Sequence, residues 1–226
     1  LAAIEQHGPH LPVDTDAVIG AHFLSTLDQI DPKAQLILPP VKVGCSAHHL
    51  AFDGTLSVPH RAMMDYVCAI LHSVRGAGFC KILLFNSHGG NQAIGQVILE
   101  DFGATHSDCH IAMVTWWTLA QDALLHISKA ERFGTGHACE FETSLMMAAG
   151  AIVQNVDLPL GEFFVPSHSW AHSSMLHKSG GTLYRSMRHI SGGTGVVGQP
   201  DVATAEQGHK ITTAVVRRLE TVVTDL

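Results

Sequence analysis

The chain has 226 residues, of which 46% are hydrophobic and 15% charged, so it can bury a substantial core within one domain spanning residues 1–226. Its formal charge of -7, from 20 acidic and 13 basic residues, leaves no basic surplus for binding phosphates. We therefore expect neither a nucleic-acid partner nor an anionic membrane. The longest apolar runs are shorter than the ~18 residues that a membrane span requires.

The cysteine pattern predicts the compartment. There are five cysteines and no CxxC pair, so neither a disulfide framework nor a zinc ribbon is indicated, and a cytoplasmic protein is the simplest expectation. Residue 1 is Leu, and residues 1–5 resemble the last part of a strand. We therefore expect an incomplete N-terminus, which could hide a signal peptide.

The first polar motif is "EQHGPHLPVDTD", residues 5–16. Glu5 and His7 are two residues apart at a strand end, so in a regular strand their side chains share a face. Asp16 lies in the first turn of a helix predicted for residues 14–30 and can return to the same edge. His10 and Asp14 have two readings, since each could bind a metal or simply orient the loop, where Asp14 or Thr15 would cap the helix.

The next segment predicts a short strand at residues 34–40, "AQLILPP", and then a long loop that contains His48. His48 could line a pocket. Pro59 can occupy the first position of a helix that ends at the glycines of residues 76–78.

The clearest unit is a βαβ pattern over residues 80–117, in which two apolar strands flank a Gly-Gly turn and an amphipathic helix. Strands this apolar are buried on both faces, as in a parallel sheet. The fold class we expect is a three-layer α/β domain with a mainly parallel sheet flanked by helices. Sites in such folds form beyond the carboxyl ends of the strands, and His88 of "NSHGGN" follows such an end, as do Glu5 and His7.

A third polar motif is "GHACEFETS", residues 136–144, where a helix is predicted for residues 140–149. If helical geometry begins at His137, then His137 and Glu140 share a face and Glu142 points about 160° away from Glu140. One of the first two could complete a metal site and the other could move protons. Cys139 raises a cysteine nucleophile as an alternative, which we disfavour because adjacent helical side chains diverge.

The remaining sequence predicts a glycine-rich irregular segment at residues 161–198 and a long amphipathic helix at residues 201–226.

The residue types of the three motifs indicate a metal site. Carboxylates and imidazoles without thiolates suit a borderline or hard divalent ion such as zinc or manganese. A lone Glu or His at a strand end is more often solvated, but here several converge. They suffice for two ions if one carboxylate bridges, and Asp16 is our candidate bridge.

Together the three motifs resemble the creatininase family of metal-dependent amidohydrolases, which includes creatinine amidohydrolase, deformylase and peptide-trimming relatives. The resemblance extends through "GTLS" at residues 54–57 and "TGVVGQPDVATAEQG" at residues 194–208. It implies a creatininase-like fold, two divalent ions (zinc or manganese, with iron as a further option) and a homo-oligomer, commonly a hexamer. It assigns proton transfer to His137, metal binding to Glu140 and a supporting role around the ligands to Glu142.

One departure concerns the substrate. Creatinine amidohydrolase carries a ligating Glu two residues after the motif-two histidine, where this chain has Gly90. Glu140 can replace that carboxylate, and the Gly89-Gly90 turn would let a substrate approach the backbone. This departure argues against creatinine itself as the substrate.

The function we expect is hydrolysis of the C–N amide bond of a small substrate, cyclic amides included, by a metal-activated water. The predicted ligands are Glu5, His7, Asp16, His88 and Glu140, with His137 as the catalytic residue. Trp116 and Trp117 could wall the pocket, or they could lie in the core or at a subunit interface. The alternatives are a formamide deformylase on a nucleotide-like intermediate, for which only Lys178, Arg185 and Arg188 offer basic side chains, a precursor-peptide peptidase, and a metal-binding scaffold without turnover.

Overall fold

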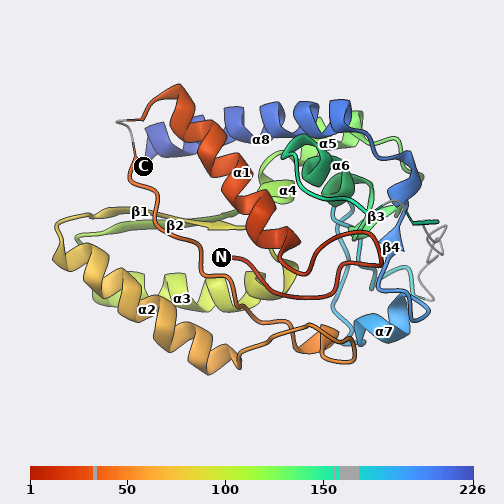
Figure 1. Ribbon diagram of the computed structural model, residues 1–226. Helices are drawn as coiled ribbons and strands as arrows, with labels where there is room; N and C mark the ends of the chain where they lie inside the picture. The colour runs from red at the N-terminus through yellow and green to blue at the C-terminus, as the bar shows by residue number, and fades with distance from the viewer. Residues whose placement is uncertain (33–34, 155, 158–167) are drawn as a thin grey trace.

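The computed structural model describes residues 1–32, 35–154, 156–157 and 168–226. Its centre is a parallel pair of strands, β1 (Lys81–Asn86) and β2 (His110–Thr115), in register along their whole length. Helices α2 (His60–Gly76) and α3 (Gln92–Thr105) cover one face of this pair, and α1 (Thr15–Ile30) and α8 (Ala205–Asp225) lie on the other (Figure 1). The predicted α/β class with helices on both sides of a parallel sheet is therefore confirmed.

Most of the other elements are short and lie on the side of the molecule where β1 and β2 end (Figure 1). Strands β3 (Thr135–His137) and β4 (Val197–Gly198) pair antiparallel with each other. Among the described residues no helix is both long and apolar enough to cross a bilayer. The remaining elements are the helices α4 (Trp116–Leu119), α5 (Gln121–Ile127), α6 (Glu140–Ala148) and α7 (Met187–Ile190), the strands β3 (Thr135–His137) and β4 (Val197–Gly198), and the 3₁₀ helices η1 (Ala47–His49), η2 (Gly89–Asn91) and η3 (Pro200–Val202).

The N-terminal segment extends the parallel pair without forming a named strand. The carbonyl of Leu1 accepts a hydrogen bond from the backbone N–H of Ser87, and Ala2 donates to the carbonyl of Val41, both at 2.9 Å. Leu1 therefore lies beside the end of β1, whereas Ala2 and Ile4 pair with Val41 and Leu56. Because the segment starts beside the end of β1, Glu5 lies close to His88 at the carboxyl edge of the strand pair.

The strand predicted at residues 34–40 is wrong for the residues that the structure describes, 35–40. Leu36 is 66% exposed and Leu38 is 46% exposed, so the apolar run is not buried in the sheet of this chain. Pro59 lies at the N-cap position, and α2 begins one residue later than predicted. Of the irregular segment at 161–198, residues 161–167 lie outside the described part, and the rest contains α7 and β4.

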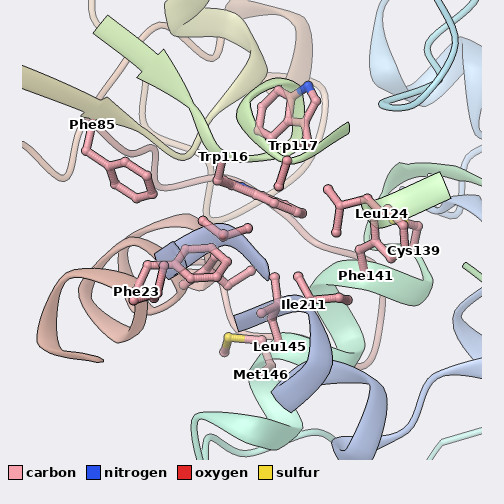
Figure 2. Packing of buried hydrophobic residues seen from close by; sticks show 14 of the residues in the cluster. Phe23, Phe85, Trp116, Trp117, Leu124, Cys139, Phe141, Leu145, Met146 and Ile211 are labelled. Carbon is pink, nitrogen blue, oxygen red and sulfur yellow. The ribbon is translucent and has the colours of Figure 1, made fainter. Parts of the chain in front are cut away.

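Two apolar clusters fill the spaces on either side of the strand pair. The larger one lies under α1, α6 and α8 and contains Trp116, whose ring centroid is 5.7 Å from that of Phe23 and 6.3 Å from that of Phe141 (Figure 2). Trp117 is buried beside it. Both tryptophans belong to this buried cluster, which is the core reading that the sequence left open, and Trp116 packs against Phe141 of the third polar motif.

Close packing of α6 against α8 depends on Gly208. A Cβ at this position would overlap the carbonyl oxygen of Ser144 and lie 2.7 Å from the Cβ of Ala148. We expect Gly208→Ala to lower the free energy of unfolding by about 1–3 kcal/mol, because backbone cannot move aside as a flexible side chain can. Denaturant unfolding measures this change.

The matched control is Gly103→Ala in α3, where the nearest atom to a new Cβ is 3.8 Å away in Ile111. Alanine should raise stability there by about 0.5–1 kcal/mol through helix propensity. Equal stabilisation by both substitutions would contradict the packing argument.

Candidate metal centre

The carboxyl end of β1 positions His88. The side-chain amide of Asn86, the last residue of β1, donates to the carbonyl of His88 at 2.8 Å and to the hydroxyl of Thr115, the last residue of β2, at 3.1 Å. These buried hydrogen bonds fix the chain where it leaves the strand and turns into η2. His88 is 3% exposed at this edge, as expected for a site in a parallel α/β fold.

The first polar motif folds back on itself and meets His88. The backbone N–H of Glu5 donates to the carbonyl of Val13 at 2.9 Å, which brings the start of α1 beside the end of the first segment. Asp16 Oδ1 consequently lies 3.5 Å from His7 Nε2, and Asp16 Oδ2 lies 3.0 Å from His88 Nδ1. Glu5 Oε1 is 3.3 Å from the same His88 nitrogen.

Three imidazoles in this cluster share one arrangement, in which a ring N–H donates to a backbone carbonyl at 2.8–3.1 Å. Because a carbonyl can only accept, that nitrogen carries the proton, and the other ring nitrogen faces the carboxylates. This orientation of a histidine by a backbone carbonyl is typical of metal ligands. The bonds run from His7 Nδ1 to Glu5, from His88 Nε2 to Cys45 and from His137 Nε2 to Gln6.

Charge pairing dominates the inner part of the cluster. Burial disfavours the charged form of every member, but the facing opposite charges outweigh it. Asp16 raises the pKa of His7 to about 10, and Glu5 and Asp16 raise the pKa of His88 well above its usual value. The pKa values of Glu5 and Asp16 are lowered in turn. A divalent cation would supply the same positive charge and displace the imidazole protons.

In His137 and Glu142, unlike the four residues above, the pKa shifts favour the neutral form of the side chain. Burial, followed by the neighbouring His7, lowers the pKa of His137 to about 3. Burial also raises the pKa of Glu142 to about 7, although His7 partly opposes the shift. His137 is therefore a neutral imidazole near neutral pH, and its Nδ1 lies 3.7 Å from Glu5 Oε1 as an acceptor.

The sequence predicted that Glu140 would face the cluster and Glu142 would point elsewhere, and the structure shows the reverse orientations. The carboxylate of Glu140 turns away from the cluster and accepts hydrogen bonds from the Ser128 hydroxyl at 2.7 Å, from the backbone N–H groups of Lys129 and Ala130 at 2.6 and 3.1 Å, and from the side-chain amide of Gln207. Glu142 Oε1 instead lies 3.8 Å from His7 Nε2.

The physical reason is where the helix begins. His137 ends β3, and α6 starts only at Glu140. Between them Ala138 has a φ of 49°, a left-handed conformation that no residue of a regular α-helix adopts. His137 and Glu140 are therefore not in one helix, and the shared helical face predicted for them is wrong.

Several buried polar atoms of the cluster have no hydrogen-bond partner among the described residues. Buried polar atoms are normally satisfied, so a group of such atoms without partners fits a cation that would take the place of imidazole protons. They are His7 Nε2, Asp16 Oδ2, both ring nitrogens of His49, and Glu142 Oε2. Donor atoms within 4.8 Å of one another make four overlapping groups: Glu5, His7 and Asp16; His7, His137 and Glu142; Glu5, His49 and His137; and Glu5, His48 and His88.

His49 is the residue that the sequence analysis missed. It is fully buried, with Nε2 3.6 Å from Glu5 Oε1 and its ring centroid 4.3 Å from that of His137. His48, the neighbour chosen from the sequence, stacks on His88 at 5.8 Å and also borders the cluster. Two adjacent histidines in a loop give no signal for which one turns inward.

The glycines of motif two differ from each other. A Cβ at Gly90 would overlap the carbonyl oxygen of Cys45 and lie 2.5 Å from His88 Nε2, so packing requires glycine at this position. A Cβ at Gly89 would have no other atom within 4 Å. The open approach to the backbone that the sequence suggested exists only at Gly89.

The remaining candidates lie outside these groups. Burial raises the pKa of Cys139 to about 12, so its thiol is protonated and a poor nucleophile. His10 Nε2 bonds the Thr143 hydroxyl at 2.9 Å and ties the first loop to α6. Arg185 and Arg188 donate to backbone carbonyls, and Asp14 is the N-cap residue of α1.

Buried imidazoles and carboxylates at the carboxyl edge of a parallel α/β fold give the chain the donor set of a metal-binding site. Its residues 1–223 match the family model named Creatininase and described as creatinine amidohydrolase. The chain is therefore a hydrolase of amide C–N bonds and belongs to the creatininase family.

Relatives with curated functions cover most of the chain. It is 28% identical to a mycofactocin precursor peptide peptidase of Mycobacterium ulcerans (strain Agy99), over 93% of this chain and 77% of the relative. It is 25% identical to a 3-dehydro-scyllo-inosose hydrolase of Thermotoga maritima, over 100% and 76% respectively. A crystal structure of a creatinine amidohydrolase (creatininase) superposes with a TM-score of 0.81 at 19% identity, covering 99% of this chain and 86% of that one. The structural likeness confirms the fold.

Proposed function

We propose that this chain hydrolyses the C–N amide bond of a small molecule, cyclic amides included, at a metal centre built from its three polar motifs. The observation that carries the proposal is the shared arrangement of His7, His88 and His137. Each donates one ring N–H to a backbone carbonyl and directs its other nitrogen toward the buried carboxylates. Family membership supports the same class of reaction.

The donor atoms fit two divalent ions, zinc or manganese, with iron as a further option. Asp16 is the proposed bridge, because its two oxygens face different histidines, His7 and His88. Glu5 would complete the His88 side, and Glu142 would complete the His7 side in place of Glu140. Oxygen and nitrogen donors without sulfur suit these metals. Ions bound here would supply a water of lowered pKa and polarise the amide carbonyl.

His137 is the proposed proton carrier. Its Nε2–H is held by the carbonyl of Gln6 at 2.8 Å, so the ring cannot turn freely, and Nδ1 remains as the acceptor on the cluster side. Nδ1 would take a proton from the attacking water and return it to the leaving nitrogen. A neutral imidazole is required for the first step, and the lowered pKa of His137 provides it.

A peptide substrate is the second candidate, favoured by the mycofactocin precursor peptide peptidase that aligns with 93% of this chain. The same residues would act on the peptide bond. Formamides are a third candidate class of substrate, predicted from the sequence. The non-enzymatic alternative is a protein that binds metal without catalysing a reaction.

A panel assay tests the proposal. The full chain, reconstituted with zinc or manganese, is incubated with cyclic amides, formamides and short peptides, and products are followed by mass spectrometry. We expect metal-dependent turnover of at least one class, which a chelator abolishes. Stoichiometric metal without hydrolysis across the panel would favour the scaffold.

We also propose a homo-oligomer, of which a hexamer is the form suggested by family analogy. A groove of about 440 Å³ lies apart from the histidine and carboxylate cluster and is lined by Pro40, Val41, Val58, Met63 and Tyr66, among others. Tyr66 is 57% exposed, so apolar surface is available to a second copy. Light scattering gives the mass in solution. A cytoplasmic location stays a prediction from the sequence.

A further inference from the structure

The opposite ends of the same two strands bring two cysteines together. Cys80 and Cys109 directly precede β1 and β2, whose first residues, Lys81 and His110, are register partners. The backbone N–H of His110 donates to the carbonyl of Cys80 at 2.7 Å, which continues the pairing to the cysteines. Six residues of strand separate this edge from the carboxyl edge, a distance of about 20 Å.

A turn adds a carboxylate to the two thiols. The backbone N–H of Cys109 donates to the carbonyl of His106 at 2.9 Å, and this turn holds Asp108 beside the cysteines. One donor atom each from Cys80, Asp108 and Cys109 lie within 4.8 Å of one another. The cysteines are half-buried and Asp108 is exposed, so a cation can reach them from solvent.

Arg75, in the last turn of α2, completes the charge balance. Its Nη2 lies 2.9 Å from Asp108 Oδ2, and its Nε donates to the same oxygen at 3.1 Å. This pairing lowers the pKa of Asp108 and orients the carboxylate. Two thiolates and one carboxylate carry three negative charges, which a divalent cation and Arg75 together would balance.

We propose that Cys80, Asp108 and Cys109 form a second metal site, which takes a thiophilic divalent cation of the zinc class. Two sulfur donors select such ions over the hard cations that oxygen donors prefer. Three protein donors leave a fourth position to water, as in open zinc sites. The bound ion would join the residues that directly precede β1 and β2 and, through Arg75, the end of α2.

This site differs from the candidate hydrolytic centre in its donors. None of the donor groups among the described residues at that centre contains a sulfur atom. Oxidation of Cys80 and Cys109 by a small disulfide would form an intramolecular disulfide and release two small thiols, but it would leave Asp108 and Arg75 without a role. The experiment separates these outcomes.

Cd²⁺ is the probe, because thiolate binding produces charge-transfer absorption in the ultraviolet. The full chain, preloaded with manganese and reduced with a phosphine, is titrated with Cd²⁺. We expect the band to saturate at one equivalent per chain and to be lost in both Cys80→Ser and Cys109→Ser. Asp108→Asn should weaken Cd²⁺ binding about tenfold or more. Cys68→Ser is the matched control, since this half-buried thiol of α2 lies outside the group, and it should keep the band.

Three results would overturn the site. They are an absent band while thiol titration shows Cys80 and Cys109 reduced, a band that survives either serine substitution, and a disulfide between the two cysteines that persists in the phosphine. The ultraviolet band reports only thiolate binding to Cd²⁺ and does not depend on catalysis. A negative result here would therefore be distinguishable from failure of the proposed hydrolysis.

Discussion

Glu142→Gln is expected to release or weaken one of two bound metal ions and to abolish amide hydrolysis. The substitution keeps the size of the side chain but removes the charge that faces His7 Nε2 at 3.8 Å. Glu142 Oε2 is buried without a hydrogen-bond partner among the described residues, so a bound cation would satisfy this oxygen. Metal affinity should fall by at least about 100-fold, since even residues that only support ligands change it by 10–100-fold. Elemental analysis of the purified variant gives the metal stoichiometry.

Glu140→Gln is the matched control, two residues away in the same helix and likewise buried. It should retain both ions, because its carboxylate accepts hydrogen bonds from Ser128 and from the backbone of residues 129 and 130 rather than facing the cluster. Loss of the charge should instead lower the free energy of unfolding by about 1–3 kcal/mol. Retention of both ions by the Glu142 variant, with loss of one from the Glu140 variant, would return the ligand role to Glu140.

His137→Ala should keep the metal stoichiometry and lower kcat by about 10²- to 10⁴-fold, the usual contribution of a general acid or base. The ring is a neutral imidazole, and its free nitrogen faces Glu5 while the carbonyl of Gln6 holds the other. Added imidazole should partly restore kcat by entering the space left by the side chain. Metal content and single-turnover rates, measured together, separate chemistry from binding.

The control for that experiment is His10→Ala, which removes a buried imidazole of the first loop that belongs to none of the candidate metal groups. It should lose stability with its hydrogen bond to Thr143 and retain kcat near the wild-type value. Metal loss in His137→Ala, without rescue by imidazole, would make His137 a ligand instead of a proton carrier.

Local sequence determined the parts of the site that lie within or next to regular elements. The apolar run of β1 ends at Asn86, so His88 was predictable at the carboxyl edge from strand geometry alone. Glu5 and His7 were placed at the same edge by their spacing of two, and the first turn of α1 supplied Asp16. Each of these predictions depended on a period or a boundary that neighbouring residues specify, and the structure brings all four side chains together.

Only the tertiary structure decided which side chains of the irregular segments point inward. The choice between Glu140 and Glu142 depends on the left-handed φ of Ala138, which is 0% exposed and held in place by the core. The choice between His48 and His49 depends on how η1 packs against Glu5 and His137. At a junction between elements, the direction of a side chain depends on one or two backbone dihedral angles, and long-range packing determines these angles. The spacing of residues in the sequence therefore cannot predict that direction.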